Sequence, residues 1–304
     1  MLDYHLHLWP HTRRQTPVVL DQVAAYCERA QAAGVVEIAL TEHLFRFVQA
    51  DRLLAGFWED DDVPRRLRSS MAGYWRFHAT ADLDQYVETV LEAKRRGLPV
   101  VLGLEVDYYR GRMDEVATLL GGYPFDVLLG SVHWVGGWRF DDVEDALSMS
   151  EWSVRDVDAC WDAYAGACAE LAAARTCDVF AHPDLIKVAA RRPEHPKEWW
   201  DRIADAAAQS GMAAEVSSAG WRKPAAEQYP AEGLLARLAA RGVPFTTASD
   251  AHHLSHVADR VEDLHALLRT VGVDHLTGFR RRQAHTVPLA DAASPGPITS
   301  DRPS

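Results

Sequence analysis

Side chains that can bind metal ions follow most of the apolar segments of this 304-residue sequence. The N-terminus contains a His-x-His pair, and later apolar runs end in a histidine, a glutamate or an aspartate. Six separate segments end in this way, so a shared function explains the pattern better than coincidence does. The candidate ligands are His5, His7, His11, His43, Glu105, His133, His182, Asp250 and His252.

The spacing and the chemical type of these residues indicate a catalytic metal centre. If the stretch from Asp3 begins as a strand, His5 and His7 lie on the same side of it, because side chains alternate with a period of two. All the candidates offer nitrogen or oxygen and none is a cysteine, which favours Zn, Mn or Fe in a catalytic site over a structural thiolate zinc site. Taken alone, the His-x-His pair also fits an ordinary packed or solvated strand end.

The elements that position these ligands alternate between strand and helix. Seven apolar segments with strand character are separated by helical segments, and polar residues gather where the strands end. In a barrel of alternating strands and helices, the active site lies at the C-terminal ends of the strands. A doubly wound open sheet also binds ligands there. The sequence has no Gly-x-Gly-x-x-Gly after a strand, which removes the usual nucleotide signature of such a sheet.

We expect one domain over residues 1–289. Residues 44–80 look irregular, and their length indicates an insertion or a lid rather than a short connection. The periodicity predicts one long amphipathic helix over 151–175 and a last strand around 286–289. Residues 290–304 are rich in Ala, Pro, Ser and Asp, which predicts a disordered tail.

Composition argues against several classes of protein. The formal net charge of −12 at pH 7 disfavours general binding of nucleic acid or of anionic membranes. No apolar run reaches the roughly 18 residues of a membrane helix, and the N-terminus lacks a basic region followed by an apolar run. The four cysteines form no Cys-x-x-Cys pair, which is typical of reduced thiols in a cytoplasmic protein. Nothing in the sequence specifies an oligomeric state.

Several further motifs accompany the ligands in a fixed order. They are GLEVDY at 103–108, YPFD at 123–126, GSVH at 130–133, GWRFD at 137–141, HPDLIK at 182–187, AGWRKP at 219–224 and SDAH at 249–252. In this order they resemble the polymerase and histidinol phosphatase (PHP) domain proteins, and among them the histidinol-phosphate phosphatases. The resemblance covers nearly the whole chain before the tail.

This resemblance implies an α/β fold of the distorted (β/α)7 type, similar to a TIM barrel, with a metal site at the C-terminal ends of the strands. It also implies three divalent metal ions, with Zn, Mn or Fe as the candidates. The ligand sets that it implies are His5, His7, Glu105 and Asp250 for one metal, His133 and His182 with Glu105 as a bridge for the second, and His11, His43 and His252 for the third.

The activity implied by the resemblance is hydrolysis of a phosphate monoester, with L-histidinol phosphate as the small phosphorylated substrate and histidine biosynthesis as the pathway. A metal-activated hydroxide would attack phosphorus, and the metals would neutralise the developing charge. His252, Asp184 or a metal-bound water would protonate the leaving alkoxide. Arg222 is a further catalytic candidate. The residues expected to contact phosphate, or to orient ligand carboxylates, are Arg222, Lys223, Lys187 and Arg139.

Other functions fit parts of the pattern. The same barrel could hydrolyse another small phosphate ester, or a C–N bond in a metal-dependent reaction. Against C–N hydrolysis, the sequence shows no obvious site for a carbamylated lysine, and Glu105 already takes the bridging position. A metal-dependent binding or proofreading-like module is the non-enzymatic alternative, and the acidic charge and single-domain length count against it.

Overall fold

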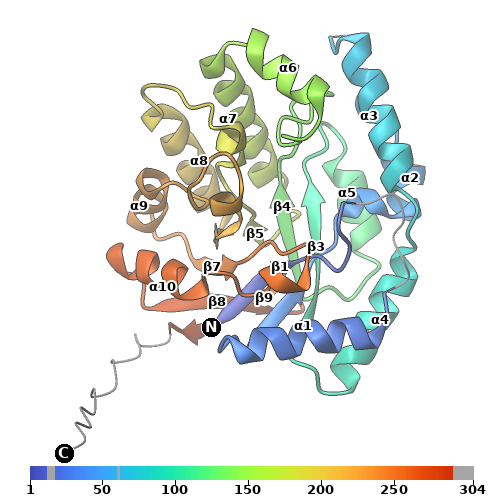
Figure 1. Cartoon of the computed structure of the whole chain (residues 1–304), viewed down its shortest axis with the longest axis vertical. Helices are drawn as coiled ribbons and strands as arrows, with labels where there is room; N and C mark the ends of the chain where they lie inside the picture. The colour runs from blue at the N-terminus through green and yellow to red at the C-terminus, as the bar shows by residue number, and fades with distance from the viewer. Residues whose placement is uncertain (12–17, 60–61, 290–304) are drawn as a thin grey trace, which may run out of the picture.

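Seven parallel strands form the centre of the molecule in a computed structural model that describes residues 1–11, 18–59 and 62–289 (Figure 1). The strands are almost entirely buried and pair with one another in chain order. Their number and order confirm the prediction of seven alternating units. They are β1 (Leu2–Leu6), β2 (Glu37–Leu40), β3 (Val100–Asp107), β4 (Val127–Ser131), β5 (Val179–Phe180), β6 (Ala213–Ser217) and β7 (Phe245–Ala248).

The sheet curves until its first and last strands meet. Leu6 and Ala251 form a parallel bridge, and the backbone N–H of His7 donates to the carbonyl of Ala251 at 2.8 Å. The hydroxyl of Thr247 donates to the carbonyl of Leu2 at 2.7 Å. Within the described ranges no regular ladder joins β1 to β7, so the barrel closes through this bridge and side chains. The fold is the expected distorted (β/α)7 barrel, and the alternative of a doubly wound open sheet is wrong.

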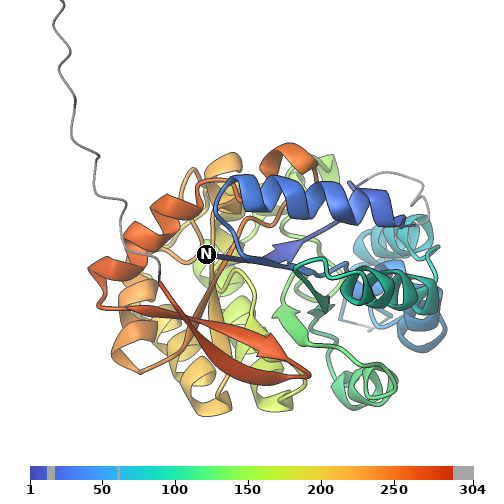
Figure 2. The same cartoon turned by 90° about the horizontal axis from the view of Figure 1, so that it is seen from below.

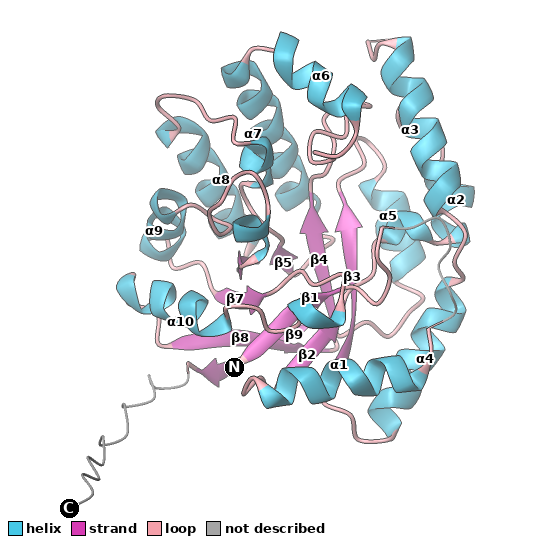
Figure 3. Ribbon diagram, viewed as in Figure 1, coloured by secondary structure: helices cyan, strands magenta, loops and turns pink. Residues whose placement is uncertain are grey.

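Helices cover the outside of the barrel (Figure 3). Aspartates begin some of them: Asp82 accepts a hydrogen bond from the backbone of Asp84 at the start of α4. The helices are α1 (Leu20–Ala32), α2 (Val48–Leu54), α3 (Arg65–His78), α4 (Leu83–Arg95), α5 (Met113–Leu120), α6 (Ala146–Val154), α7 (Val157–Ala174), α8 (Lys197–Ser210), α9 (Glu232–Ala240) and α10 (Val261–Thr270), with short 3-10 turns η1 (Leu44–Arg46), η2 (Leu185–Ala189), η3 (Ala219–Arg222) and η4 (Leu254–His256).

The prediction of one long helix over 151–175 is wrong. The chain forms two helices there, α6 and α7, which are separated at Arg155 and Asp156. Asp156 is extended, and its side chain accepts a hydrogen bond from the backbone N–H of Ala159 at 2.8 Å. Aspartate is a preferred N-cap, so this residue starts α7 afresh and prevents α6 from continuing into it.

The segment 44–80 is not irregular, because it contains η1, α2 and α3. Helix α3 buries Leu67, Met71, Trp75 and His78, which recur at helical spacing on one face. Arg66 pairs with Glu151 of α6 at 2.5 Å, and the two helices stand beside the C-terminal ends of β3 and β4 (Figure 1). The segment therefore forms a packed wall at the end of the barrel that carries the ligands, and its action as a lid stays a prediction.

A two-stranded hairpin, β8 (His275–Arg280) and β9 (Gln283–Pro288), covers the opposite end of the barrel (Figure 2). The sequence predicted only a strand around 286–289. The backbone N–H of Phe279 donates to the hydroxyl of Tyr4 at 3.2 Å, and that of Arg282 donates to the carbonyl of Asp126, just before β4, at 2.9 Å. These contacts lie at the N-terminal ends of the strands, away from the candidate ligands.

Other expectations concerned the surface and the end of the chain. Among the described residues, no helix is long and apolar enough to cross a membrane. The predicted tail, residues 290–304, lies outside the described residues.

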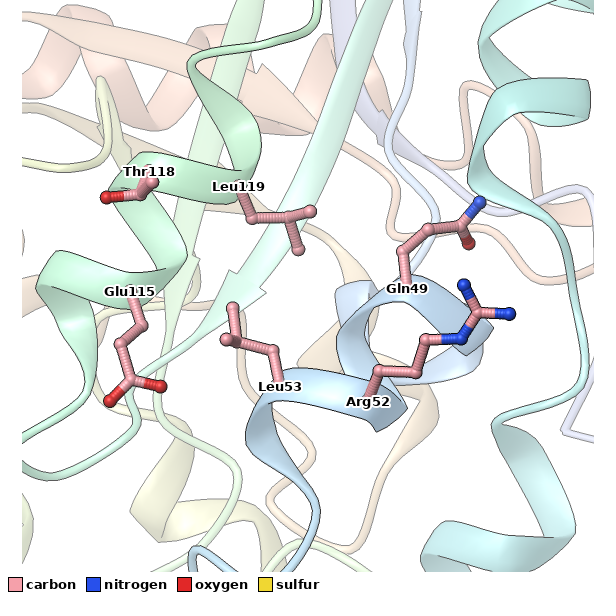
Figure 4. Close-up of a pocket in the computed structure, with 6 residues that line it drawn as sticks. All are labelled: Gln49, Arg52, Leu53, Glu115, Thr118 and Leu119. Atoms are coloured by element: carbon pink, nitrogen blue, oxygen red, sulfur yellow. The ribbon is translucent and has the colours of Figure 1, made fainter.

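A shallow, mostly apolar cleft of about 410 Å³ lies between α2 and α5 and contains none of the candidate ligands (Figure 4). Its lining residues are Gln49, Arg52, Leu53, Glu115, Thr118 and Leu119.

Candidate metal centre

The candidate ligands gather where the strands end. His5 lies within β1 and Glu105 within β3, whereas His43 and His133 follow β2 and β4 by a few residues. Each of them is buried. Parallel strands in a barrel bring their C-terminal ends to one side, so residues far apart in the sequence meet there.

Two of the candidate ligands have an unusual backbone conformation. His182 follows β5 with φ 27°, and Asp250 follows β7 with φ 49°. A positive φ costs a non-glycine residue about 1–3 kcal/mol and is found preferentially at functional sites. In both places the turn comes two residues after the strand, where the chain leaves the barrel beside the other ligands.

Glu105 is the centre of the cluster and is fully buried. Its Oε2 atom lies 2.7 Å from Nδ1 of His43. The same oxygen lies 3.2 Å from Nε2 of His5 and 3.4 Å from Nε2 of His7. One oxygen of the carboxylate thus faces three imidazoles from the β1 and β2 segments.

The other oxygen of Glu105 faces a different pair of imidazoles. Oε1 lies 3.0 Å from Nε2 of His182 and 3.3 Å from Nε2 of His133. A carboxylate with a separate group of ligands at each oxygen has the arrangement that a bridge between two cations requires. The position of Glu105 agrees with the bridging role that the family resemblance implies.

Asp250 and His252 complete the cluster from the β7 side. Oδ1 of Asp250 lies 3.5 Å from Nε2 of His7 and 3.6 Å from Nδ1 of His252. The rings of His43 and His252 both pack against His7, with centroids 4.3 Å and 4.1 Å from it and 5.8 Å from each other. Donor atoms of His7, His43 and His252 lie within 4.8 Å of one another, close enough to share one ion.

His11 lies at the edge of this cluster. Its ring stacks on His252 with centroids 4.3 Å apart, and it lies 5.5 Å from the ring of His43. It belongs to none of the groups of described residues whose donor atoms all lie within 4.8 Å of one another. The structure therefore brings His11 beside its expected partners, and its ligation of a metal stays a prediction.

The chemistry of the buried donors fits divalent metal ions. Several of these atoms make no hydrogen bond although they are inaccessible to water: Nε2 of His5, Nε2 of His7, both ring nitrogens of His43, Oε2 of Glu105 and Nε2 of His252. Buried polar atoms are nearly always hydrogen-bonded, because an unpartnered one costs about 1–3 kcal/mol. A cation among these nitrogens and oxygens would satisfy them together, and a set of imidazoles and carboxylates suits Zn, Mn or Fe.

Two carboxylates that the sequence analysis did not select contact the ring nitrogens of His5 and His133 that face away from Glu105. Nδ1 of His5 lies 2.8 Å from Oε2 of Glu215, and Nδ1 of His133 lies 2.5 Å from Oδ1 of Asp107. Such partners fix the orientation and tautomer of a ligating histidine. Strand periodicity offered a signal for Asp107, which lies two residues after Glu105 and therefore on the same side of β3. Glu215 is likewise a charged residue inside an otherwise apolar strand.

Glu42, another carboxylate that was missed, supports the loop after β1. Its Oε1 atom accepts hydrogen bonds from the backbone N–H groups of Leu8 and Trp9 at 2.6 and 2.9 Å. Its Oε2 atom lies 3.6 Å from Nδ1 of His7. Glu42 thus fixes the path of the backbone that leads to His11 and places a negative charge beside His7.

The charges of the centre shift its pKa values strongly. Burial alone lowers the pKa of His133, but the charges of Glu105 and Asp107 outweigh it and raise the pKa to about 10. Burial raises the pKa of Asp250, yet the positive charge of His5 and a hydrogen bond from His7 bring it well below the usual range. The carboxylates of the centre thus stabilise positive charge, as a metal site requires.

Lys187, an expected substrate contact, forms a buried ion pair with Asp184, an expected proton donor. Nζ of Lys187 lies 2.9 Å from Oδ2 of Asp184 and 2.9 Å from Glu227, and it donates to the carbonyl of Gln228 at 2.7 Å. Asp184 also accepts a hydrogen bond from the backbone of Ala231 at 2.8 Å. These partners favour a structural role for the pair.

The remaining expected contacts have other partners, and only Arg222 is shown in contact with the backbone of a candidate ligand. Nη2 of Arg222 donates to the carbonyls of Ser249 and Asp250 at 2.5 and 3.3 Å, while its Nη1 donates to Asp259. Lys223 is exposed. Arg139 pairs with Asp142, donates to the hydroxyl of Ser70 at 3.2 Å and lies over the ring of Tyr74. Contact of any of the three with a substrate stays a prediction.

Replacing Glu215 with Gln is expected to weaken metal binding about ten- to a hundredfold, because His5 loses the carboxylate that fixes and polarises its ring. Competition with a metal-sensitive fluorescent chelator measures the change. Glu232→Gln, at an exposed position in the first turn of α9, is the matched control. Equal affinities of the two variants would mean that Glu215 does not support a ligand.

Known proteins resemble this chain in sequence. A family model described as PHP domain matches residues 5–219. A protein of Deinococcus radiodurans described as "Probable histidinol-phosphatase" is 36% identical over 186 residues, which make up 61% of this chain and 70% of that protein.

Solved structures share the fold. The histidinol phosphate phosphatase of Lactococcus lactis subsp. lactis Il1403, solved with zinc, L-histidinol and phosphate, is 19% identical with a TM-score of 0.65, and the match covers 93% of this chain and 98% of that one. The hisK protein of Listeria monocytogenes is 18% identical with a TM-score of 0.67, over 86% of this chain and 99% of that one. The family model covers well over half of the sequence. The chain therefore belongs to the PHP domain family.

Proposed function

We propose that this protein hydrolyses phosphate monoesters, and that its substrate is L-histidinol phosphate in histidine biosynthesis. The observation that carries the proposal is the position of Glu105, whose two oxygens face separate groups of imidazoles and so suit a centre of several cations. The identity of 36% to a protein described as a histidinol-phosphatase supports the choice of substrate.

The proposed centre holds three divalent ions. Zinc is the first candidate, because the Lactococcus lactis structure was solved with zinc, and Mn and Fe are the others. Bound ions would lower the pKa of a coordinated water and neutralise charge on the phosphoryl group. The proposed ligand sets are His5, His7, Glu105 and Asp250; His133 and His182 with Glu105; and His11, His43 and His252.

The protein's own residues have separate tasks in this proposal. Asp184 is poorly suited to hand a proton to the leaving alkoxide, because it is fully buried and paired with Lys187. That task is left to a metal-bound water or to His252, whose side chain is 18% exposed. Arg222 orients Asp250 through the backbone carbonyls of the β7 loop. Lys223, which is exposed nearby, is left to contact the phosphate.

The proposal includes a cytoplasmic location and no nucleic acid or membrane partner. The four cysteines are all buried free thiols, which supports a reducing compartment. The net charge of −12 supports a small substrate that is attracted locally by the metal centre, rather than a polyanion bound over the surface.

The test is phosphate release by the zinc-, manganese- or iron-loaded protein. We expect fast release from L-histidinol phosphate and slower release from a panel of other monoesters. His133→Ala is expected to abolish release, because its ring faces Glu105 and Asp107 in the centre of the cluster. Loaded protein that releases phosphate from other esters but not from L-histidinol phosphate would contradict the substrate. Release that is unchanged in His133→Ala would contradict the site.

A further inference from the structure

Arg46 is a fully buried cation beside the proposed metal centre, and none of the roles described so far uses it. It ends η1, three residues after His43, and its carbonyl accepts hydrogen bonds from the backbone N–H groups of Thr80 and Ala81 at 3.0 and 2.9 Å. The backbone of Arg46 is thus fixed between the strand end that carries His43 and the end of the wall formed by α3.

One nitrogen of the Arg46 guanidinium makes all of its polar contacts. Nη1 donates to the carbonyls of Trp9 and Pro10 at 3.3 and 3.4 Å. It also lies 3.8 Å from Oε2 of Glu42, too far for a hydrogen bond. Through Nη1 the side chain reaches the backbone directly before His11.

The other two nitrogens, Nε and Nη2, are buried and have no hydrogen-bond partner in the described chain. Together they form one edge of the planar guanidinium, from which two N–H groups point in parallel. This edge matches two oxygens of a phosphate or carboxylate, and such paired, charge-assisted bonds are the strongest hydrogen bonds in proteins. Leaving both donors unpartnered in the interior is costly, so an anion that accepted from both would stabilise Arg46.

The surroundings of Arg46 point to the active site. Arg46 lies three residues after His43, and through Nη1 it reaches the carbonyl of Pro10, directly before His11. His78 of α3 has its ring 6.2 Å from that of His11. His78 is buried, and its Nδ1 also lacks a partner. Arg46 therefore belongs to the same end of the barrel as the candidate ligands.

We propose that Arg46 binds the phosphoryl group of the substrate, with Nε and Nη2 donating to two of its oxygens. The assignment rests on the proposed function for its substrate, but its anion chemistry can be tested separately. It adds a residue from segment 44–80 to the site, and gives that segment a binding role besides forming a wall.

The test uses inorganic phosphate as the probe and the metal-loaded full chain. Isothermal titration measures the Kd of phosphate for wild type, Arg46→Lys and Arg46→Met at equal metal content, which is checked by elemental analysis. Loss of a bidentate charged contact is expected to raise the Kd about ten- to a hundredfold in Arg46→Met. Lysine keeps the charge but not the two parallel donors. The Kd of phosphate for Arg46→Lys is therefore expected to lie between those for wild type and Arg46→Met. Arg76→Met, at an exposed position on α3, controls for loss of one positive charge.

Two results would overturn this assignment. The first is a phosphate Kd within twofold of wild type in Arg46→Met. The second is a loss of metal in that variant, with phosphate binding restored when metal is added back, because Arg46 would then only position the backbone before His11. If Arg46→Met does not fold, Arg46→Lys decides between the same outcomes. A chain that binds phosphate through Arg46 but hydrolyses no monoester contradicts the proposed function alone.

Discussion

Replacing Glu105 with Gln is expected to lower kcat/KM for phosphate release by at least about a thousandfold and to reduce the metal content. Each oxygen of this buried carboxylate faces its own group of imidazoles. Glutamine keeps the shape of the side chain but removes its negative charge, and one of its two ends becomes an amide donor that cannot bind a cation. One of the two proposed metal sites that share Glu105 therefore loses a ligand, and the other keeps only a neutral oxygen.

Steady-state kinetics and elemental analysis on the same preparations measure this loss. Glu115→Gln, on the exposed side of α5, is the matched control and is expected to behave as wild type. Circular dichroism should show the same helix content in both variants, because the substitution leaves the barrel intact. The prediction is contradicted if Glu105→Gln keeps the metal content of wild type and an activity within tenfold of wild type. Glu105 would then be essential neither for metal binding nor for catalysis.

Much of the candidate site could be predicted from the sequence because its pattern is local. Each parallel strand is a short apolar run, and its C-terminal end is marked by the first polar residues that follow. His5, Glu105 and His133 each lie at such an end, and parallel strands bring these ends together without any knowledge of which strands are neighbours. The spatial cluster follows from the repeated pattern alone.

The partners of these ligands could not be predicted in the same way. Glu215 holds the ring of His5 across a separation of 210 residues, and only the closure of the barrel brings the two together. Arg46 appeared to lie in an irregular segment, because η1 and α2 are too short to show a clear helical period. Its importance depends on burial and on unpartnered donors, which a sequence does not reveal.

The errors in secondary structure have equally specific causes. Residues 146–174 are apolar enough to continue one helical pattern, and a single capping contact at Asp156 divides it. The strand β8 was missed because its stability comes from pairing with β9 and from contacts with residues such as Tyr4 at the other end of the chain. Neither effect changes the hydrophobic period along the chain.

Metal affinity is expected to rise with pH between pH 6 and 8. The expected rise is about tenfold per pH unit for every proton that metal binding displaces. In the metal-free protein, Glu105 and Asp107 overcome the effect of burial and raise the pKa of His133 to about 10. The ring is therefore protonated at neutral pH, and a metal that takes Nε2 must displace a proton. A higher pH removes that competitor, so binding tightens until the pH approaches the pKa.

Calorimetric titration of zinc in buffers with different ionisation enthalpies counts these protons directly. Asp107→Asn is the informative variant, because it removes one of the two charges that raise the pKa of His133. We expect this variant to release fewer protons at pH 7 and to show a shallower dependence of affinity on pH. The folding stability of the metal-free protein should fall with pH, whereas metal affinity rises. The stability that protonated His133 contributes is fully present below about pH 6.5 and is lost as the pH rises through about 10. Zinc binding that releases no proton at pH 7 would contradict the prediction, because His133 would then already be neutral before the metal arrives.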